Sequence, residues 1–347
     1  VLFRSGILMR TFTNKRSLIS VVLSVVLVFF IYLSFSLNSS LSYPDLRNKH
    51  IVVYVALREE EAKYLLELFK QKTGCTYEYI KLPTEEAVMR ILDEKSNPQG
   101  NIFIGGTADG YELLKSYGVL SKYKSPNAKN ISSNYKDSDN YWTGFEIEPL
   151  SIGINKNAWN KQFGSKVPMP KTFEDLTNPL YKDKIILRDP KSSRTGYTFL
   201  ANLYQQMNEK SFSQLITALK NNTNKLTISG FNSIQRVSSG EYTMTVNFLG
   251  DQKIMGKSNK DIVTIIPKNT GWNVNAIAAI KNSKNTKESK AFIDFCLSDE
   301  IAEKLSKFSM ATSTKNYENI NYDIYKKYSF EKAAYDRNKI MKIWDNK

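Results

Sequence analysis

Short apolar runs alternate with amphipathic segments in the first third of the chain, and this alternation is the strongest constraint on its fold. The run at 51–55 is typical of a buried strand, strands are also predicted at 76–82 and 101–104, and the segments between them carry apolar residues at helical spacing. Strands that alternate with helices predict an α/β lobe with a mainly parallel sheet. Because ligands of such sheets bind outside the carboxyl ends of the strands, the loops 56–60 and 105–109 are expected to face a cleft.

A polar loop at 189–198 follows another apolar run and precedes a segment with apolar residues at helical spacing. The loop is therefore expected to place hydroxyls beside the unpaired N–H groups of a first helical turn, where the helix end is positive. This combination predicts an anion site. Its members are Ser192, Ser193, Thr195 and Gly196. Arg194 adds a planar cation that suits carboxylate or phosphate, whereas the alternative is that Ser193 or Thr195 only caps the helix.

The loop also carries a family resemblance. Asp-Pro-Lys-Ser-Ser-Arg-Thr-Gly-Tyr at 189–197 resembles the D-P-x-x-S-G-T-x-Y loop of the type II solute-binding proteins of bacterial ABC importers, in the subgroup with ferric-ion, phosphonate and hexose-phosphate binders. Arg194 stands where that subgroup usually has Gly, which suggests a side-chain contact in its place. Further segments match the family in type and order. They lie at 53–57, 105–109, 117–120, 148–156, 172–176, 271–272, 276–280 and 291–295.

The resemblance implies an α/β, two-lobe type II periplasmic-binding-protein fold with hinge strands. The first lobe is expected at 45–149, the second at 150–270, and a return to the first lobe with C-terminal helices at 271–347. The implied function is capture of a small anionic, phosphorylated solute in the interlobe cleft, for delivery to an ABC permease. We expect a monomer that needs no cofactor, at the extracellular face of the membrane or in the periplasm.

Five residues outside the loop at 189–198 are further candidates for ligand binding. Arg58 could contact an anion or be a solvated surface residue. Gly106 and Thr107 offer N–H groups at a helix entry, where the alternative is capping by Thr107 or Asp109. Trp272 could stack on the ligand or pack at the hinge.

The segment 247–251 resembles the family's F-x-H-D segment, whose His-Asp pair contacts sugar hydroxyls in the sugar-phosphate binders. Gly250 replaces the His here, so only Asp251 carries over. Its carboxylate could accept hydrogen bonds from hydroxyl or ammonium groups, or Asp251 could simply be a turn residue.

The N-terminus predicts a membrane segment. Residues 1–17 are expected to be a cytoplasmic stretch, partly artefactual because 2–5 resemble a translated sequencing adapter. Residues 18–37 carry no charge and follow Arg10, Lys15 and Arg16, so they are expected to be a transmembrane anchor or, alternatively, a cleaved signal segment. An anchor suggests a second role for the same fold, namely a tethered sensor subunit that signals phosphosugar to a histidine kinase.

Composition limits the other classes. The net charge of +15 favours anionic partners, but no nucleic-acid motif accompanies it, so nucleic acid is not expected to bind. One histidine and two cysteines argue against a His-based triad and a Cys/His zinc site, and no enzyme signature is present. Both thiols are expected to be buried and free. The iron binders of the family that this chain resembles typically use adjacent tyrosines as ligands, and the 20 tyrosines here include no adjacent pair. Ferric binding through scattered tyrosines and carboxylates therefore stays a lesser alternative.

Overall fold

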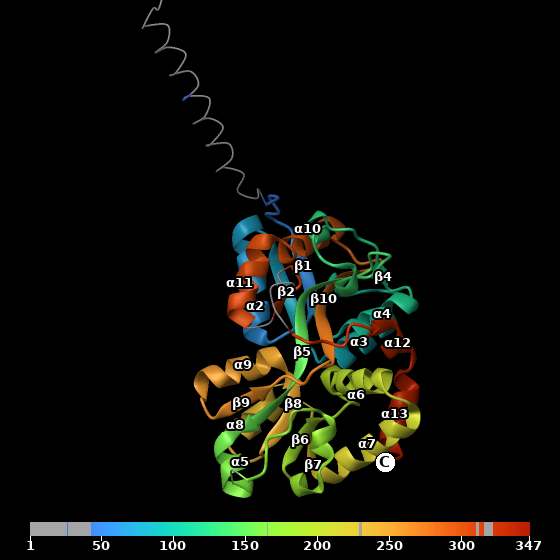
Figure 1. Ribbon diagram of the computed structural model, residues 1–347. Helices are drawn as coiled ribbons and strands as arrows, with labels where there is room; N and C mark the ends of the chain where they lie inside the picture. The colour runs from blue at the N-terminus through green and yellow to red at the C-terminus, as the bar shows by residue number, and fades with distance from the viewer. Residues whose placement is uncertain (1–25, 27–42, 165, 229–230, 310–311, 316–321) are drawn as a thin grey trace, which may run out of the picture. The chain divides into compact units, whose positions relative to one another are not determined.

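The computed structural model describes residues 26, 43–164, 166–228, 231–309, 312–315 and 322–347 (Figure 1). Residues 45–347 form one compact unit. The expected apolar segment at 18–37 lies outside the described residues except for Val26, as does the whole of 1–17. Across the part that the structure describes, no helix is long and apolar enough to cross a membrane. The anchor therefore stays a prediction.

The first lobe contains the strand and helix alternation that the sequence predicts. Strands run in the order β2-β1-β3-β10-β5, with β1 parallel to both β2 and β3, and with β10 antiparallel to β3 and β5. The first three strands are β1 (His50–Ala56), β2 (Thr76–Lys81) and β3 (Ile102–Gly105). The helices that connect or follow them are α2 (Glu59–Thr73), α3 (Thr84–Asp93) and α4 (Ala108–Ser116). α2 buries Leu65, Leu66 and Phe69 because these apolar residues share one helical face.

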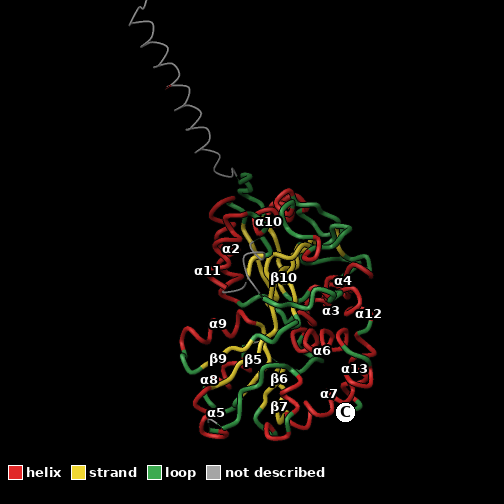
Figure 2. Tube along the Cα trace, in the orientation of Figure 1, coloured by secondary structure: helices red, strands yellow, loops and turns green. Residues whose placement is uncertain are grey.

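A single long strand joins the two lobes. β5 (Thr143–Asn155) is buried along its whole length. Its first part pairs with β10 (Trp272–Ile280), and its second part pairs with β8 (Met244–Phe248) and β9 (Ile262–Ile265). The N–H of Leu150 donates to the carbonyl of Gly271 over 2.7 Å, so the outgoing and returning chains are tied together where β5 changes partners. Figure 2 shows strands in both lobes, with β10 in the upper lobe and β9 in the lower one.

The second lobe is a smaller α/β layer. β6 (Ile185–Arg188) pairs in parallel with both β7 (Thr223–Thr227) and β8. Its helices are α5 (Lys156–Phe163), α6 (Arg194–Gln206), α7 (Glu209–Asn222), α8 (Asn232–Ser238) and α9 (Leu249–Ser258). One part of its core consists of Ile186, Ile234, Val237, Tyr242 and Met255. The lobe limits given from the sequence stay predictions.

The C-terminal segment contacts both lobes. α12 (Phe330–Tyr335) packs against α4, whereas α13 (Arg337–Asp345) packs against α6 and α7 (Figure 1). Lys220 Nζ donates to the carbonyl of Trp344 over 2.9 Å. The remaining elements are β4 (Leu120–Ser121), β11 (Thr312–Ser313), α10 (Thr286–Cys296), α11 (Asp299–Ser309), and 3-10 turns at Pro126–Ala128, Ser133–Tyr135, Glu174–Thr177 and Pro179–Tyr181. Cys75 and Cys296 are free and buried, which confirms the expectation for the thiols.

Candidate ligand-binding site

A cavity of about 420 Å³ lies between the lobes, at the carboxyl ends of β1, β2, β3, β6 and β8. This is the place that the strand order predicts for a ligand. It brings together most of the residues expected from the sequence, which are Arg58, Gly106, Thr107, Ser192, Ser193, Arg194, Thr195 and Asp251. Two expected residues, Gly196 and Trp272, are not among the lining residues.

The first-lobe contribution centres on Thr107. This residue occupies the N-cap position of α4, yet its side chain makes no capping hydrogen bond. Its Oγ1 is buried and has no hydrogen-bond partner among the described residues. Gly106 has φ +77°, and a Cβ there would lie 2.6 Å from Thr84 Oγ1. Only glycine therefore lets the loop turn tightly enough to carry Thr107 to the cavity.

The second-lobe contribution is the loop before α6. Ser193 caps this helix, because its Oγ accepts a hydrogen bond from the Gly196 N–H over 3.3 Å. Ser192 behaves differently, since its buried Oγ lacks a hydrogen-bond partner within the described part of the chain. Gly196 supports the loop from behind, where a Cβ would lie 2.7 Å from the carbonyl oxygen of Arg188. Capping is therefore the role of Ser193, whereas ligand contact by Ser192 stays a prediction.

Arg194 lines the cavity but is deeply buried, with 2% of its surface exposed. Its Nη1 lies 2.6 Å from Asp109 Oδ2, and its Nε lies 2.6 Å from Glu85 Oε2. These two first-lobe carboxylates compensate the charge of the guanidinium inside the protein, so Arg194 is not a surface side chain. Direct contact between Arg194 and a ligand stays a prediction.

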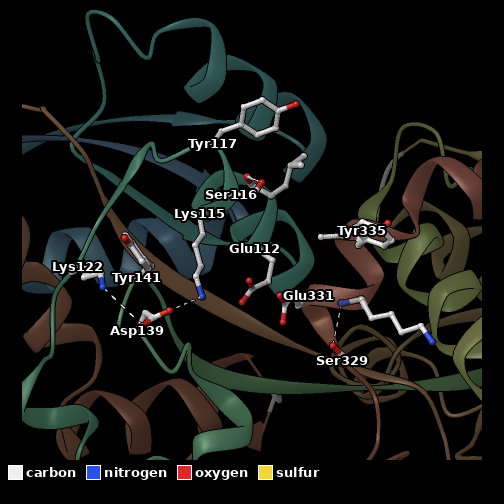
Figure 3. Close-up of a pocket in the computed structure, with 13 residues that line it drawn as sticks. Glu112, Lys115, Ser116, Tyr117, Lys122, Asp139, Tyr141, Ser329, Glu331 and Tyr335 are labelled. Atoms are coloured by element: carbon white, nitrogen blue, oxygen red, sulfur yellow. Dashed lines mark hydrogen bonds and ion pairs between the residues drawn. The ribbon is translucent and has the colours of Figure 1, made fainter.

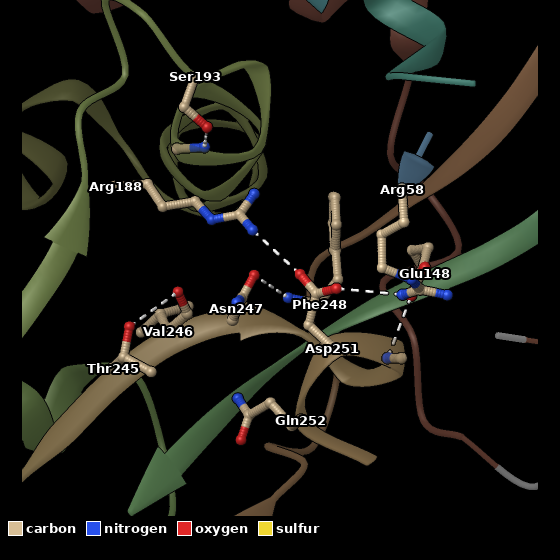
Figure 4. Close-up of polar contacts among 12 residues, drawn as sticks. Arg58, Glu148, Arg188, Ser193, Thr245, Val246, Asn247, Phe248, Asp251 and Gln252 are labelled. Carbon is tan, nitrogen blue, oxygen red and sulfur yellow. Dashed lines mark hydrogen bonds and ion pairs between the residues drawn. The ribbon is translucent and has the colours of Figure 1, made fainter. Parts of the chain in front are cut away.

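A charged cluster occupies the cavity wall around Asp251 (Figure 4). The Asp251 carboxylate accepts from Arg58 Nη1 over 3.2 Å and from Arg188 Nη2 over 3.0 Å. Glu148 lies next to this group and accepts from the N–H of Gly250 over 3.3 Å. Arg58 belongs to the first lobe and Arg188 to the second, so Asp251 is held by cations from both lobes. Asp251 lies in the first turn of helix α9, so it is not the loop-turn residue that the sequence offered as the alternative.

Burial changes the protonation of the carboxyl groups in this cluster. The pKa of Glu148 is raised to about 8 by burial and by the neighbouring Asp251 and Glu146 carboxylates. The pKa of Glu61 is raised well above its ordinary value, mainly by burial and by Glu146. Glu148 is therefore largely protonated near neutral pH, and burial favours the neutral form of Glu61, so the cavity wall carries less negative charge. Burial also lowers the pKa of Arg188.

Sequence reasoning missed three members of this cluster. Glu61 lies with Glu59 and Glu60 in the first turn of α2, where acidic residues favour the helix dipole, but its side chain is buried at the cavity. Glu148 lies within the strand that crosses between lobes, and Arg188 ends the apolar strand β6. A charged residue within or directly after an apolar run could have indicated Glu148 and Arg188 from the sequence. Such a charge is costly to bury unless it is paired or hydrogen-bonded.

Trp272 lies at the start of β10 and not at the cavity. It is 2% exposed, and its Nε1 donates to the carbonyl of Tyr325 over 2.8 Å. Its ring meets Tyr135 and Phe330 edge to face. These contacts favour the hinge-packing alternative over stacking on a ligand.

A second hollow, of about 910 Å³, lies over α4 and α12 on the first lobe (Figure 3). Glu112 and Glu331 approach each other across it, and Tyr117 and Tyr335 stand at its rim. Lys115 and Lys122 are both paired with Asp139. This hollow lies away from the carboxyl ends of the strands and contains none of the residues expected from the sequence, so we place the ligand in the interlobe cavity.

Two α/β lobes, a crossing strand and a cavity at the strand ends define a protein that binds a small ligand between its lobes. A family model for bacterial extracellular solute-binding proteins matches residues 97–339, and the chain belongs to this family. It is thus a solute-binding protein of the ABC-importer type, which acts in the periplasm or outside the cell and partners with a permease.

Three similar proteins illustrate the range of the family. An uncharacterised protein of Haemophilus influenzae is 27% identical over 255 residues, which cover 72% of this chain and 73% of that protein. The periplasmic binding protein AfuA of Actinobacillus pleuropneumoniae, solved with exogenous fructose-6-phosphate bound, is 25% identical with a TM-score of 0.80, and the match covers 86% of this chain and 98% of AfuA. A ferric binding protein of Campylobacter jejuni shares the fold at 21% identity and a TM-score of 0.72, over 85% and 98% of the two chains.

Proposed function

We propose that this protein captures a small phosphorylated solute in the interlobe cavity and delivers it to an ABC permease. The observation that carries the proposal is the pair of buried hydroxyls on Thr107 and Ser192, which lack partners among the described residues. A buried polar group without a hydrogen bond costs free energy, so a ligand that accepts hydrogen bonds would relieve both groups. Phosphate oxygens are strong acceptors and suit the positive ends of α4 and α6.

The rest of the solute would face the cluster around Asp251. Its carboxylate can accept hydrogen bonds from hydroxyl groups, whereas Arg58 and Arg188 keep its charge neutralised. Protonated Glu148 does not repel an anion and can itself donate a hydrogen bond. This division into an anion end and a hydroxyl end fits a phosphosugar. The fructose 6-phosphate bound by AfuA, a relative with the same fold, is consistent with this class of ligand.

Delivery would depend on closure of the lobes. Because the cavity wall comes from both lobes, a bound solute makes its full set of contacts only when the lobes are closed. Such a ligand shifts the population toward the closed state, with β5 and the chain before β10 as hinges. The permease would then distinguish the loaded protein from the empty one by its shape.

A thermal-shift panel on the full-length chain in mild detergent tests this proposal. Fructose 6-phosphate, glucose 6-phosphate, phosphoglycerate and a phosphonate are compared with free fructose, inorganic phosphate and ferric citrate. A ligand at 100 times its dissociation constant stabilises the protein by about 2.7 kcal/mol, which is easily detected. We expect a response to at least one organophosphate and none to free fructose. A response to ferric citrate alone would overturn the proposal.

The tethered-sensor alternative uses the same cavity and rests on the uncharged run at 18–37. Neighbouring permease and ATPase genes would support transport, whereas a kinase and response-regulator pair would support sensing. N-terminal sequencing of native protein tests the anchor itself. A sequence that begins near Ser40 or Tyr43 would show cleavage and weaken the sensor role.

A further inference from the structure

Arg194 joins the two lobes through a buried chain of charges. It lies in the first turn of α6 in the second lobe, whereas Asp109 belongs to α4 and Glu85 to α3 in the first lobe. The side chains of Arg194 and Asp109 are each 1% exposed, and their nitrogen and oxygen atoms are 2.6 Å apart. The carboxylate of Glu85 bonds Arg194 on one side and Arg337 of α13 on the other, over 2.6 Å and 3.0 Å.

The C-terminal segment packs against α6, the helix that carries Arg194. Tyr197 of the same helix is buried, and the Arg337 guanidinium lies 4.5 Å from the centre of the Tyr197 ring. The hydroxyl of Tyr197 donates to the carbonyl of Ala333, which fixes α12 against α6. Arg194 therefore has its first-lobe partners on one side and the C-terminal segment on the other.

We infer that Arg194 is a closure latch, a positioning residue that sets the balance between the open and closed lobes. Its two carboxylate partners lie on the opposite lobe, so the contacts exist only when the lobes are together. In an open protein, all three side chains would be solvated. A buried charge that loses its partner is strongly unfavourable, so removing either partner penalises the closed state and leaves the open state unaffected.

This latch differs from the direct contact that the sequence predicts for Arg194. A direct contact would change the affinity of a ligand without changing the empty protein. A latch changes the fraction of empty protein that is closed, and the apparent dissociation constant of every ligand rises by the same factor. The inference rests on the proposed function only in that the lobes close over a solute.

The test measures the empty protein and needs no ligand. Spin labels at Lys63→Cys on α2 and Lys161→Cys on α5 report the distance between the lobes by pulsed electron resonance, because both positions are exposed and lie on different lobes. The native thiols Cys75 and Cys296 are buried. Arg194→Met and Asp109→Asn are measured singly and together in the full-length chain. The matched control is Arg47→Met with Asp45→Asn, an exposed ion pair within the first lobe.

We expect each single variant to lower the ratio of closed to open protein by about tenfold or more, because one buried charge is left unmatched. The double variant should recover most of this loss, because no unpaired charge remains, and the control pair should match the wild type. Melting curves confirm that each variant is folded. A wild-type chain that is entirely open without ligand, or single variants with unchanged distances, would overturn the inference. Neither result depends on the thermal-shift panel, so the latch and the proposed function can fail separately.

Discussion

Arg58 and Asp251 meet across the cleft, with Nη1 of the arginine 3.2 Å from Oδ1 of the aspartate. The other oxygen of Asp251 lies 3.0 Å from Arg188, which is almost wholly buried. One carboxylate thus compensates a cation from each lobe. Asp251 links the hydroxyl end of the proposed site to the pairing of the lobes, and its substitution should affect both.

Asp251→Asn should weaken binding and lower stability together. The amide keeps the shape but removes the charge that compensates Arg188. We expect the affinity for the organophosphate found in the panel to fall by about tenfold to hundredfold, the range for a charge-assisted hydrogen bond. The free energy of unfolding should fall by about 2 kcal/mol or more. Titration calorimetry and urea unfolding measure the two effects, with the exposed Asp93→Asn as control. Unchanged affinity would remove Asp251 from the site.

Unlike Asp251→Asn, the substitutions Thr107→Val and Ser192→Ala should weaken ligand binding without lowering the stability of the fold. Neither hydroxyl has a hydrogen-bond partner among the described residues, and an unpaired buried polar group is costly, so removing it should leave the free energy of unfolding unchanged or raise it. Affinity for the organophosphate should still fall by about tenfold for each variant, because each loses one hydrogen bond to a charged group.

Ser193→Ala is the matched control for this pair. Its hydroxyl accepts from the Gly196 N–H, so the substitution should lower stability by about 1 kcal/mol through loss of the helix cap. Urea unfolding measures the stability of the three variants, and titration calorimetry measures their affinity for the organophosphate. If Thr107→Val and Ser192→Ala bind like the wild type, the anion is held elsewhere in the cavity.

The sequence predicts the frame of this protein better than the charges within it. The runs at 51–55 and 101–104 become β1 and β3, and the loops after them line the cavity as expected from the strand order. Local patterns suffice for such features because strands, helices and their ends depend on neighbouring residues.

The partners of the buried charges could not be predicted in the same way. Arg194 pairs with Asp109, which is 85 residues distant, and Arg58 pairs with Asp251, 193 residues away. These pairings depend on how the two lobes pack together, and the local spacing of apolar residues does not predict that packing. The sequence also left the helix cap open between Ser193 and Thr195, whereas in the structure the hydroxyl of Ser193 accepts from the Gly196 N–H.

The raised pKa of Glu148 predicts a particular dependence of stability on pH. Its ordinary value is 4.5, and in the folded protein it rises to about 8, first because of burial and then because of Asp251 and Glu146. Between these two values, the folded protein holds a proton that the unfolded chain has released. Raising the pH therefore favours the unfolded chain, so Glu148 lowers stability progressively from about pH 4.5 to about pH 8, with no further change above that.

Glu148→Gln should abolish this dependence, because glutamine stays neutral and its carbonyl oxygen can still accept from Gly250. We expect the variant to gain at least about 1 kcal/mol over the wild type between pH 5 and pH 8.5, against a limit of about 1.4 kcal/mol per pH unit for one proton. Guanidinium unfolding at several pH values measures the gain. Exposed Glu174→Gln serves as control. Glu148 is one cause of the raised pKa of Glu61, so the measured difference includes the change at Glu61. A difference between Glu148→Gln and wild type that stays constant with pH would mean that Glu148 is ionised in the folded protein, and that the cavity wall carries a charge unfavourable to an anionic solute.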